Sequence, residues 1–378
     1  MILLACVALG IWLYLVAWRG GFWLAAIRDE AGPAPSDWPA VTAVIPARNE
    51  ADGIAECITS LGRQDYRGRF SIIVVDDQST DGTGEIARRA ARRAGFNDRL
   101  TVLAGGAPPA GWTGKLWAMK QGIEHAHTRL PAYLLFTDGD IVYSTDMLSR
   151  LVAKAEADGL VLNSLMAKLR CVSLAERALV PAFVFFFQML YPFAWVNRPK
   201  HRMAAAAGGC MLVRLDALRA AGGIESIRGE LIDDCALAAK LKRQGAIRLA
   251  LTDGVHSIRA YPALGDIRRM VARSAYAQLR YSPVALVMTV AGMALTYLTP
   301  VMLTIFGRGL AQASGLFTWT IMAFAFQPTL RFYHLSPLWG LFLPGIALMY
   351  TAFTLDSAYQ HARGAGGLWK GRVQAPLR

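Results

Sequence analysis

Two long apolar blocks enclose a stretch of ordinary composition, and this layout restricts the fold more than any other feature of the chain. Residues Ile2 to Val16 are apolar apart from one glycine, and most of Val284 to Tyr350 is apolar. The hydrophobic share of the whole chain, 54%, exceeds the usual range for soluble domains. We therefore expect an N-terminal membrane anchor over residues 1–28, C-terminal membrane helices over 282–357 and a basic tail over 358–378.

The charge balance and the cysteines restrict the classes of partner and site. The net charge is +13 at pH 7, but no stretch carries a basic and aromatic nucleic-acid motif, so we expect no nucleic-acid partner. Attraction to an anionic membrane leaflet explains the excess, as do solvated helix faces such as Ala87 to Arg93. The five cysteines have neither metal-ligand spacing nor a paired framework, which fits a reduced compartment. No basic residue precedes the first apolar run, whereas Arg19 and Arg28 follow it, so we expect an uncleaved anchor with these residues on the cytoplasmic side.

Between the apolar blocks, strand-like and helix-like patterns alternate. Apolar runs predict strands at Val41–Ile45, Ser71–Val75, Leu100–Leu103 and Tyr133–Phe136, and helical spacing predicts helices at Glu50–Gly62, Gly84–Ala94 and Trp117–His125. This alternation is typical of an α/β fold with a doubly wound, mostly parallel sheet, here over residues 38–281. Ligands of such sheets bind beyond the carboxyl ends of the strands.

The segment Ala178 to Val196 is almost wholly apolar and nearly long enough to cross a bilayer, which needs about 20 residues. A crossing here would place a membrane between the acids Asp138 and Asp140 on one side and Asp233 and Asp234 on the other. We therefore predict a helix that lies in the membrane interface, and a buried core helix is the alternative. The neighbouring basic residues Arg198, Lys200, His201 and Arg202 would then lie beside lipid headgroups.

Three segments near the C-terminus are candidate membrane crossings: Val284–Phe306, the shorter Gly315–Leu330 and Leu338–Leu355. One anchor plus three crossings would place the tail outside the cytoplasm. The tail residues that favour the cytoplasmic side are Arg363, Lys370, Arg372 and Arg378. Either one segment is re-entrant or the tail departs from the charge rule.

Three acidic signatures follow one another along the soluble stretch. Asp76-Asp77 and Asp138-Gly139-Asp140 each follow a strand, and Asp233-Asp234 begins a helix. A carboxylate at a strand end can accept hydrogen bonds from a base or a ribose, although a turn or a helix cap needs the same residue types. Two carboxylates one residue apart suit a hard cation when substrate phosphates complete its ligands. A carboxylate at a helix start can act as a general base on a hydroxyl group, and a simple cap is the alternative.

The run Gly111-Trp-Thr-Gly-Lys115 is similar to a P-loop but lacks the required spacing, since position 109 is proline. Lys115 remains a candidate for pairing with a donor phosphate, and a solvated lysine is the alternative. Together, the acids and the flanking apolar blocks predict an enzyme that uses a nucleotide-linked donor and a membrane-embedded acceptor.

The order and spacing of these motifs resemble the family 2 glycosyltransferases with a GT-A fold, over Val41 to about Tyr281. The resemblance rests on the stretches Val44–Glu50, Val74–Thr83, Gly114-Lys115, Thr137–Asp140, Gly208–Arg214 and Ile232–Leu237. The apolar insert Phe183–Trp195 and the C-terminal block are most similar to the hopene-associated glycosyltransferases of bacterial hopanoid clusters. This resemblance implies a multi-pass protein of the bacterial inner (cytoplasmic) membrane with a cytoplasmic catalytic domain. No motif encodes the oligomeric state.

The resemblance also implies a role for each candidate residue. The donor-binding set would be Pro46, Glu50, Asp76, Asp77, Lys115, Asp138 and Arg273, with Glu50 and Asp77 on the uridine portion of a UDP-sugar. Asp138 and Asp140 would bind the donor diphosphate through Mg²⁺ or Mn²⁺, Asp140 most directly. Asp234 would be the catalytic base of an inverting hexosyl or N-acetylhexosaminyl transfer, with Asp233 in place of the family's glutamate. The acceptor side would include Gly208, Gly209, Phe186 and Trp195.

One motif of the processive family members is absent. Their Gln-x-x-Arg-Trp sequence corresponds here to Met270-Val-Ala-Arg273-Ser274 or, at best, to Gln278-Leu-Arg-Tyr281. The missing tryptophan and the small number of membrane helices argue against polymer synthesis. The expected acceptor is a membrane lipid of the hopanoid type, with a polyprenyl phosphate, a carotenoid or a diglyceride as alternatives. A non-catalytic membrane scaffold that binds nucleotide sugars is the remaining alternative.

Overall fold

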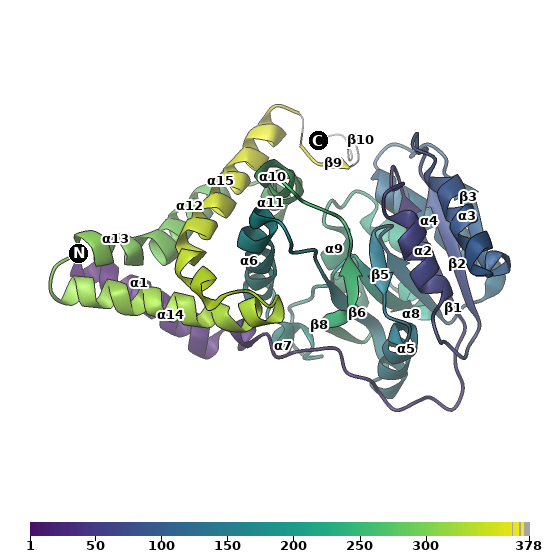
Figure 1. Ribbon diagram of the computed structural model, residues 1–378, viewed down its shortest axis with the longest axis horizontal. Helices are drawn as coiled ribbons and strands as arrows, with labels where there is room; N and C mark the ends of the chain where they lie inside the picture. Colours follow the sequence, from purple (N-terminus) through teal and green to yellow (C-terminus); the bar gives the residue numbers. More distant parts are fainter. Residues whose placement is uncertain (365, 370–371, 374–378) are drawn as a thin grey trace. The chain divides into compact units, whose positions relative to one another are not determined.

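The structure is a computed structural model that describes residues 1–364, 366–369 and 372–373 (Figure 1). It consists of two compact units, each assembled from separate parts of the chain. The helical unit comprises Met1–Ala26, Cys171–Ala194 and Ala260–Gly367, and the sheet unit comprises Ile27–Arg170, Trp195–Arg259 and Leu368–Arg378. The predicted domain over 38–281 therefore includes parts of both units. Of the four basic residues named for the predicted tail, Lys370 and Arg378 lie outside the described residues.

An eight-stranded sheet forms the centre of the sheet unit, in the order β3-β2-β1-β4-β7-β6-β8-β5. Its strands are β1 (Val41–Ala47), β2 (Phe70–Asp76), β3 (Leu100–Ala104), β4 (Tyr133–Thr137), β5 (Ile141–Tyr143), β6 (Leu160–Lys168), β7 (Cys210–Arg214) and β8 (Ala246–Ser257). The four predicted strands are β1 to β4, and they pair in parallel as expected. A separate antiparallel pair joins β9 (Leu368–Trp369) and β10 (Arg372–Val373).

The second half of the sheet corrects the expectation of a mostly parallel arrangement. β7 runs antiparallel to both β4 and β6, and β5 runs antiparallel to β8. Alternating strands and helices imply a parallel direction only where a crossover helix joins consecutive strands. β5 instead follows β4 through a tight turn, and β7 follows the return of the chain from the helical unit. The sheet is therefore mixed.

Helices cover both faces of the sheet. α2 (Ile54–Gly62), α3 (Thr83–Ala94) and α5 (Met147–Ala157) pack with Ala43 and Ile45 of β1 in one core. α4 (Gly114–Ala126) lies against the opposite face, where a Cβ on Gly122 would come 2.5 Å from Val44. Glycine is therefore needed for the close approach of α4 to β1. The helices α8 (Leu215–Ala220) and α9 (Asp233–Leu241) follow β7.

Aromatic side chains fill the core of the helical unit. Its helices are α1 (Ile2–Trp18), α6 (Leu174–Leu190), α10 (Leu264–Ala272), α11 (Ala275–Gln278), α12 (Pro283–Met293), α13 (Thr299–Phe306), α14 (Leu310–Phe332) and α15 (Leu343–Ala362). The short helix α7 (Phe193–Val196) contains residues of both units. The ring centroids of Trp12 and Tyr297 are 5.5 Å apart, and those of Phe185 and Phe326 are 5.2 Å apart. Edge-to-face pairs of this kind add about 1 kcal/mol each beyond the area they bury.

Most of the apolar segment Ala178–Val196 lies in α6, and one side of this helix is buried in the aromatic core. Val180 and Phe185 are fully buried there. Within the helical unit, α6 therefore contributes to the core. Its position at a membrane interface stays a prediction.

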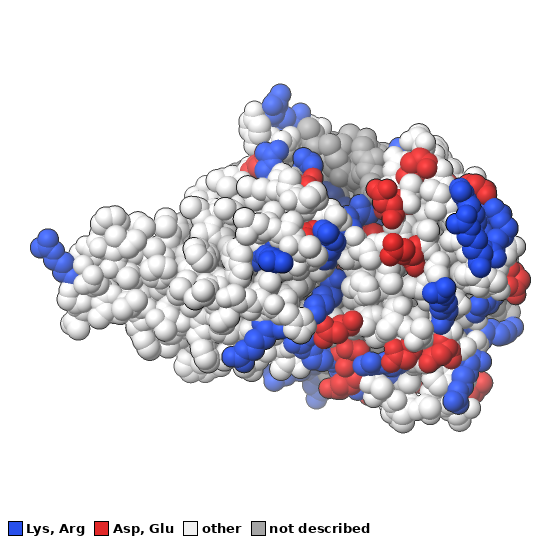
Figure 2. Space-filling model, viewed as in Figure 1, with Lys and Arg blue, Asp and Glu red and all other residues white. Residues whose placement is uncertain are grey.

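In the described part of the chain, two helical stretches are long and apolar enough to cross a membrane, Pro283–Phe306 and Pro337–Ala362. α1 is also apolar, but its 17 residues are fewer than the roughly 20 that a span requires. Large apolar side chains such as Val284, Met288 and Phe306 are exposed on the helical unit, and Figure 2 shows wide areas of its visible surface without charged side chains. Exposed apolar surface of this extent is typical of a membrane or protein contact. The number of crossings stays a prediction.

α6 begins with a capping box that a buried carboxylate completes. Ser173 Oγ accepts a hydrogen bond from the Glu176 N–H at 3.1 Å, and Glu176 Oε2 accepts from the N–H groups of Val172 and Ser173, each at 2.8 Å. Glu176 Oε1 accepts from the Tyr261 N–H at 2.7 Å. Because Glu176 is fully buried, these bonds replace its hydration and join the start of α6 to the chain before α10.

Replacing Glu176 with Ala is expected to lower the free energy of unfolding by about 3 kcal/mol, because three backbone donors would lose a charged acceptor. The measurement is thermal unfolding of the protein in detergent, followed by circular dichroism. Ser173→Ala removes the hydroxyl half of the capping box and is expected to cost about 1 kcal/mol. Equal, small losses for the two variants would contradict the role given to Glu176.

Candidate functional site

Hydrogen bonds between loops give the carboxyl ends of β1 and β2 a fixed shape. After β1, Asn49 takes a left-handed conformation with φ 49°, and after β2, Gln78 does so with φ 56°. The Asn49 N–H donates to Ser79 Oγ at 3.0 Å, and Asn49 Oδ1 accepts from the Thr80 N–H at 2.9 Å. Asparagine tolerates this backbone conformation because its short side chain can bond locally. The two loops therefore form one rim at the sheet edge where the donor was predicted to bind.

Of the two adjacent aspartates after β2, one is a cap and the other is buried. Asp76 Oδ1 accepts from the Ser79 N–H at 3.0 Å, and Oδ2 accepts from the Gly84 N–H at 3.2 Å at the start of α3. Asp76 thus has the turn and cap role that was the alternative interpretation. Asp77 is 1% exposed, and its Oδ2 lies 3.8 Å from Arg48 Nη1. Contacts of either residue with a donor stay predictions.

In the tight turn after β4, the carboxylates of Asp138 and Asp140 have different partners. Asp138 Oδ1 lies 3.1 Å from Lys115 Nζ. Asp140 Oδ2 accepts from Ser257 Oγ at 2.5 Å and from Arg259 Nε at 3.3 Å. Burial alone would raise the pKa of Asp140, but the Arg259 guanidinium and the Ser257 hydroxyl outweigh burial, so this pKa lies below its ordinary value. Asp140 is therefore ionised at neutral pH.

Lys115 joins the turn after β4 to the start of α9. It lies in the first turn of α4, whose N-cap Thr113 accepts from the Leu116 N–H at 3.3 Å. Lys115 Nζ is 3.1 Å from Asp138 Oδ1 and 3.2 Å from Asp233 Oδ2. The structure thus brings two predicted acids together around the ammonium group of Lys115, itself a predicted site residue.

Asp234 is held by backbone N–H groups beside this cluster. Its Oδ2 accepts from the Gly208 N–H at 3.0 Å, and its Oδ1 accepts from the Cys235 N–H at 2.7 Å. A Cβ on Gly208 would lie 3.4 Å from both Asp234 Oδ2 and Lys115 Nζ, so Gly208 is adjacent to both groups. Burial, and then the Asp233 carboxylate, raises the pKa of Asp234 to about 6, while Lys115 and the two N–H groups oppose the rise. A carboxylate with this pKa is ionised at neutral pH and can accept a proton.

Arg259 is a member of this site that the sequence interpretation missed. Its Nη2 lies 2.8 and 2.7 Å from the two carboxylate oxygens of Glu50 and 3.3 Å from Asp140 Oδ1. Glu50 and Asp140 are each 8% exposed. The Glu50 N–H also donates a hydrogen bond to Thr83 Oγ1 at 2.9 Å. Pro46, which was predicted for the donor site, lies inside the wholly buried strand β1. The sequence offered one signal for Arg259: it lies just beyond the end of a strand, β8, and two of the acidic pairs were recognised by the same kind of position.

Three predicted acceptor residues belong to the sheet unit: Trp195 lies in α7, and Gly208 and Gly209 lie on the loop between α7 and β7. Gly208 contacts Asp234 as described, and the Gly209 carbonyl accepts from Thr137 Oγ1 at 2.9 Å. The ring of Trp195 stacks on His201 with centroids 5.1 Å apart. Gly208 is therefore a member of the acid cluster, and the acceptor role of Trp195 stays a prediction.

The remaining two predicted site residues belong to the helical unit. The ring of Phe186 lies 5.1 Å from that of Tyr350 in the aromatic core. Arg273 directly follows α10 as its C-cap, and its N–H donates to the Arg269 carbonyl at 3.2 Å. Their roles toward acceptor and donor stay predictions.

The carboxylates fit a divalent cation that obtains its other ligands from phosphate. Within the described residues, no group of three or more His, Cys, Asp or Glu side chains is arranged to hold a metal alone. Mg²⁺ in nucleotide sites needs one or two carboxylates, because substrate phosphates and water supply the rest. Asp138 suits this role, since its side chain is 37% exposed. The oxygens of Asp140 are engaged by Ser257 and Arg259, so its access to a cation is less direct.

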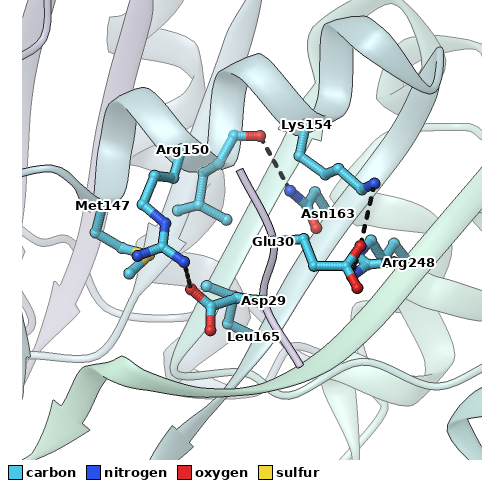
Figure 3. Close-up of a pocket in the computed structure, with 9 residues that line it drawn as sticks. Asp29, Glu30, Met147, Arg150, Lys154, Asn163, Leu165 and Arg248 are labelled. Carbon is cyan, nitrogen blue, oxygen red and sulfur yellow. Dashed lines mark hydrogen bonds and ion pairs between the residues drawn. The ribbon is translucent and has the colours of Figure 1, made fainter. Parts of the chain in front are cut away.

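Among the described residues, two cavities of the sheet unit are lined by side chains outside the predicted site. Figure 3 shows one in which Asp29 and Glu30 meet the basic residues Arg150, Lys154 and Arg248. Asp29 Oδ2 is 2.7 Å from Arg150 Nη2, and Glu30 Oε2 is 3.5 Å from Arg248 Nη2. Its volume of about 10 Å³ has room for only one water molecule, which excludes a larger ligand. The role of these ion pairs is therefore to hold the chain that precedes β1 in place. A second cavity of about 250 Å³ is lined by residues of α4 and α8 and by the chain between α8 and α9.

Comparisons with known proteins find similarity to glycosyltransferases. Residues 42–222 match the glycosyl transferase family 2 model. The glycosyltransferase AglE of Haloferax volcanii is 32% identical over 125 residues, which are 33% of this chain and 38% of AglE. An N-acetylglucosaminyltransferase of Bradyrhizobium sp. is 30% identical over 130 residues, which are 34% of this chain and 78% of that relative. The chain thus spans much less than two thirds of AglE but most of the Bradyrhizobium protein.

A solved structure shares the fold over nearly the whole chain. The mannosyltransferase PcManGT from Pyrobaculum calidifontis, in complex with GDP-Man and Mn²⁺, is similar with a TM-score of 0.56 and 21% identity, and 98% of each chain is covered. The α/β fold with a mixed sheet is therefore of the GT-A type. On the family match and the Bradyrhizobium relative, the chain belongs to glycosyltransferase family 2.

Proposed function

We propose that this protein transfers a sugar from a nucleoside diphosphate donor to a hydroxyl group of a membrane lipid, with inversion at the anomeric carbon. The observation that carries this proposal is the position of Asp234, a carboxylate with a pKa of about 6, beside the cluster of Lys115, Asp138 and Asp233. Asp234 is the base, and the cluster beside it can hold a diphosphate. Glycosyl transfer requires both of these functions at one site.

The donor is proposed to bind at the carboxyl ends of β1, β2 and β4. Glu50 and Asp77 would face the nucleoside, which is a uridine in the favoured case. Lys115 would exchange part of its pairing with Asp138 and Asp233 for the negatively charged diphosphate. A divalent cation, Mg²⁺ or Mn²⁺, held by Asp138 with Asp140 behind it, would neutralise charge on the leaving diphosphate.

In the proposed reaction, Asp234 accepts the proton of the acceptor hydroxyl while that oxygen attacks the anomeric carbon. A carbon–oxygen bond forms on the face opposite the diphosphate, and the bond between the anomeric carbon and the diphosphate oxygen breaks. The electron pair of the broken bond leaves with the nucleoside diphosphate. The Gly208 N–H keeps the Asp234 carboxylate oriented for this proton transfer.

A lipid acceptor is supported by the exposed apolar side chains of the helical unit and by its two helices of membrane-spanning length. We propose a hopanoid-type lipid in the bacterial inner membrane, with the sheet unit on the cytoplasmic side. Polyprenyl phosphate, carotenoid and diglyceride acceptors have the same apolar character, so the assay must separate them.

The test is a transfer assay with the full-length protein in lipid nanodiscs. UDP-N-acetylglucosamine and GDP-mannose are supplied with Mn²⁺ or Mg²⁺, and each acceptor class is added separately. Mass spectrometry is expected to show one lipid class heavier by a single sugar residue. Binding of a nucleotide sugar without transfer to any lipid class would instead support the non-catalytic scaffold and overturn the proposal.

A further inference from the structure

Arg259 connects two acids that come from different strand ends. Glu50 follows β1, Asp140 follows β4, and Arg259 follows β8, where Ser257 is the last residue of the strand. The guanidinium lies within 2.8 Å of both Glu50 oxygens and within 3.3 Å of both Asp140 oxygens. Both carboxylates are buried, so the guanidinium supplies the positive charge that compensates them.

The same oxygens are those that a metal ion would need. A divalent cation binds carboxylate oxygens at about 2.1 Å, whereas the guanidinium and the Ser257 hydroxyl already donate three hydrogen bonds to the oxygens of Asp140. A second positive charge next to Arg259 would also be repelled, because few water molecules screen charges at a buried site. The negative charge of a diphosphate would offset that repulsion.

We propose that Arg259 is a positioning residue that keeps the nucleotide-free site closed to divalent cations, so that the cation enters together with the nucleoside diphosphate. The inference rests on the proposed role of Asp138 and Asp140 in metal binding. Arg259 would act through Asp140, which it holds away from a free cation until the diphosphate supplies the compensating charge. A purely structural guanidinium would stabilise the fold without setting this order of binding.

The test measures Mn²⁺ alone, by the electron paramagnetic resonance signal of free Mn²⁺, with the full-length protein in detergent. Wild type is expected to bind Mn²⁺ weakly without nucleotide and tightly with UDP or GDP. Arg259→Met is expected to bind Mn²⁺ at least about tenfold more tightly than wild type without nucleotide, because two buried carboxylates lose their cation. Arg243→Met, which removes an exposed arginine beyond α9, is the matched control and is expected to equal wild type.

Double variants keep the test decisive. Glu50→Gln combined with Arg259→Met leaves the net charge of the site unchanged, so it is suited to fold even where the single variant does not. It is expected to retain the gain in Mn²⁺ affinity, whereas Asp140→Asn combined with Arg259→Met is expected to lose it. Folding of each variant is verified by a cooperative thermal transition.

Two results would overturn the inference: tight Mn²⁺ binding by nucleotide-free wild type, or unchanged Mn²⁺ affinity in a folded protein that lacks Arg259. Failure of the proposed function has a different signature. In that case neither UDP nor GDP changes Mn²⁺ binding by wild type and no sugar is transferred, whatever Mn²⁺ does in the Arg259 variants.

Discussion

Asp234→Asn is expected to lower the rate of sugar transfer by about 10²–10⁴-fold, because the amide cannot accept the proton of the acceptor hydroxyl. The donor KM is expected to stay close to that of wild type, since the cluster of Lys115, Asp138 and Asp233 remains intact. The measurement is kcat and KM for the lipid product at saturating acceptor. Asp98→Asn, at an exposed position after α3, controls for the effect of removing a carboxylate. Undiminished kcat would remove Asp234 from the role of base.

The pH dependence provides a control for the same residue. The pKa of Asp234 is raised to about 6, and only the ionised form accepts a proton, so wild-type kcat should rise as pH increases through about 6 and then level off. The residual activity of Asp234→Asn should lack this rise. An acidic limb retained in the variant would assign it to another group.

Lys115→Met is expected to lower kcat/KM for the donor by about 100-fold, because a cation facing the diphosphate is lost. Two carboxylates, those of Asp138 and Asp233, would then face the diphosphate without their shared ammonium group. The pKa of Asp234 should also rise further, since Lys115 lowers it in wild type, and the acidic limb of the pH profile should move to higher pH. Donor affinity is measured by calorimetry and the pH profile by the transfer assay.

The matched control for this variant is on the same helix. Lys120→Met removes a lysine of α4 that pairs with Glu124 and Glu225 away from the acids, at 2.7 and 2.5 Å. It is expected to leave donor affinity unchanged. Lys115→Arg should recover part of the lost affinity, because a guanidinium restores the charge with a different shape. Donor affinity of Lys115→Met equal to that of wild type would show that Lys115 has a structural role alone.

The first half of the sheet could be predicted because its signals are local. β1 to β4 are apolar runs separated by helical patterns, and the crossover helices force parallel pairing. β5 has three residues, and its pairing with β8 joins positions more than a hundred residues apart. No local pattern encodes such a pairing, which is why the mixed half of the sheet was not predicted.

At the site, likewise, the types of residue could be predicted from the sequence, whereas their contacts could not. Acids at strand ends and at a helix start were recognisable, and the structure brings Asp138, Asp233 and Asp234 together through Lys115 and its neighbour Gly208. The choice between cap and ligand at Asp76 depended on backbone N–H directions, which sequence does not contain. Arg259 was missed because a single arginine carries no motif.

The interleaving of the two units along the chain limits how the enzyme can be shortened. A soluble version that ends before α12 would still carry α1 and α6, because α1 precedes the whole sheet in the chain and α6 lies between β6 and β7. Phe185 packs against Phe326 of α14, so removing α14 would expose the Phe185 ring to water. Such a fragment should aggregate unless α6 is redesigned with polar residues, and biochemical work will need the whole polypeptide with a lipid or detergent belt.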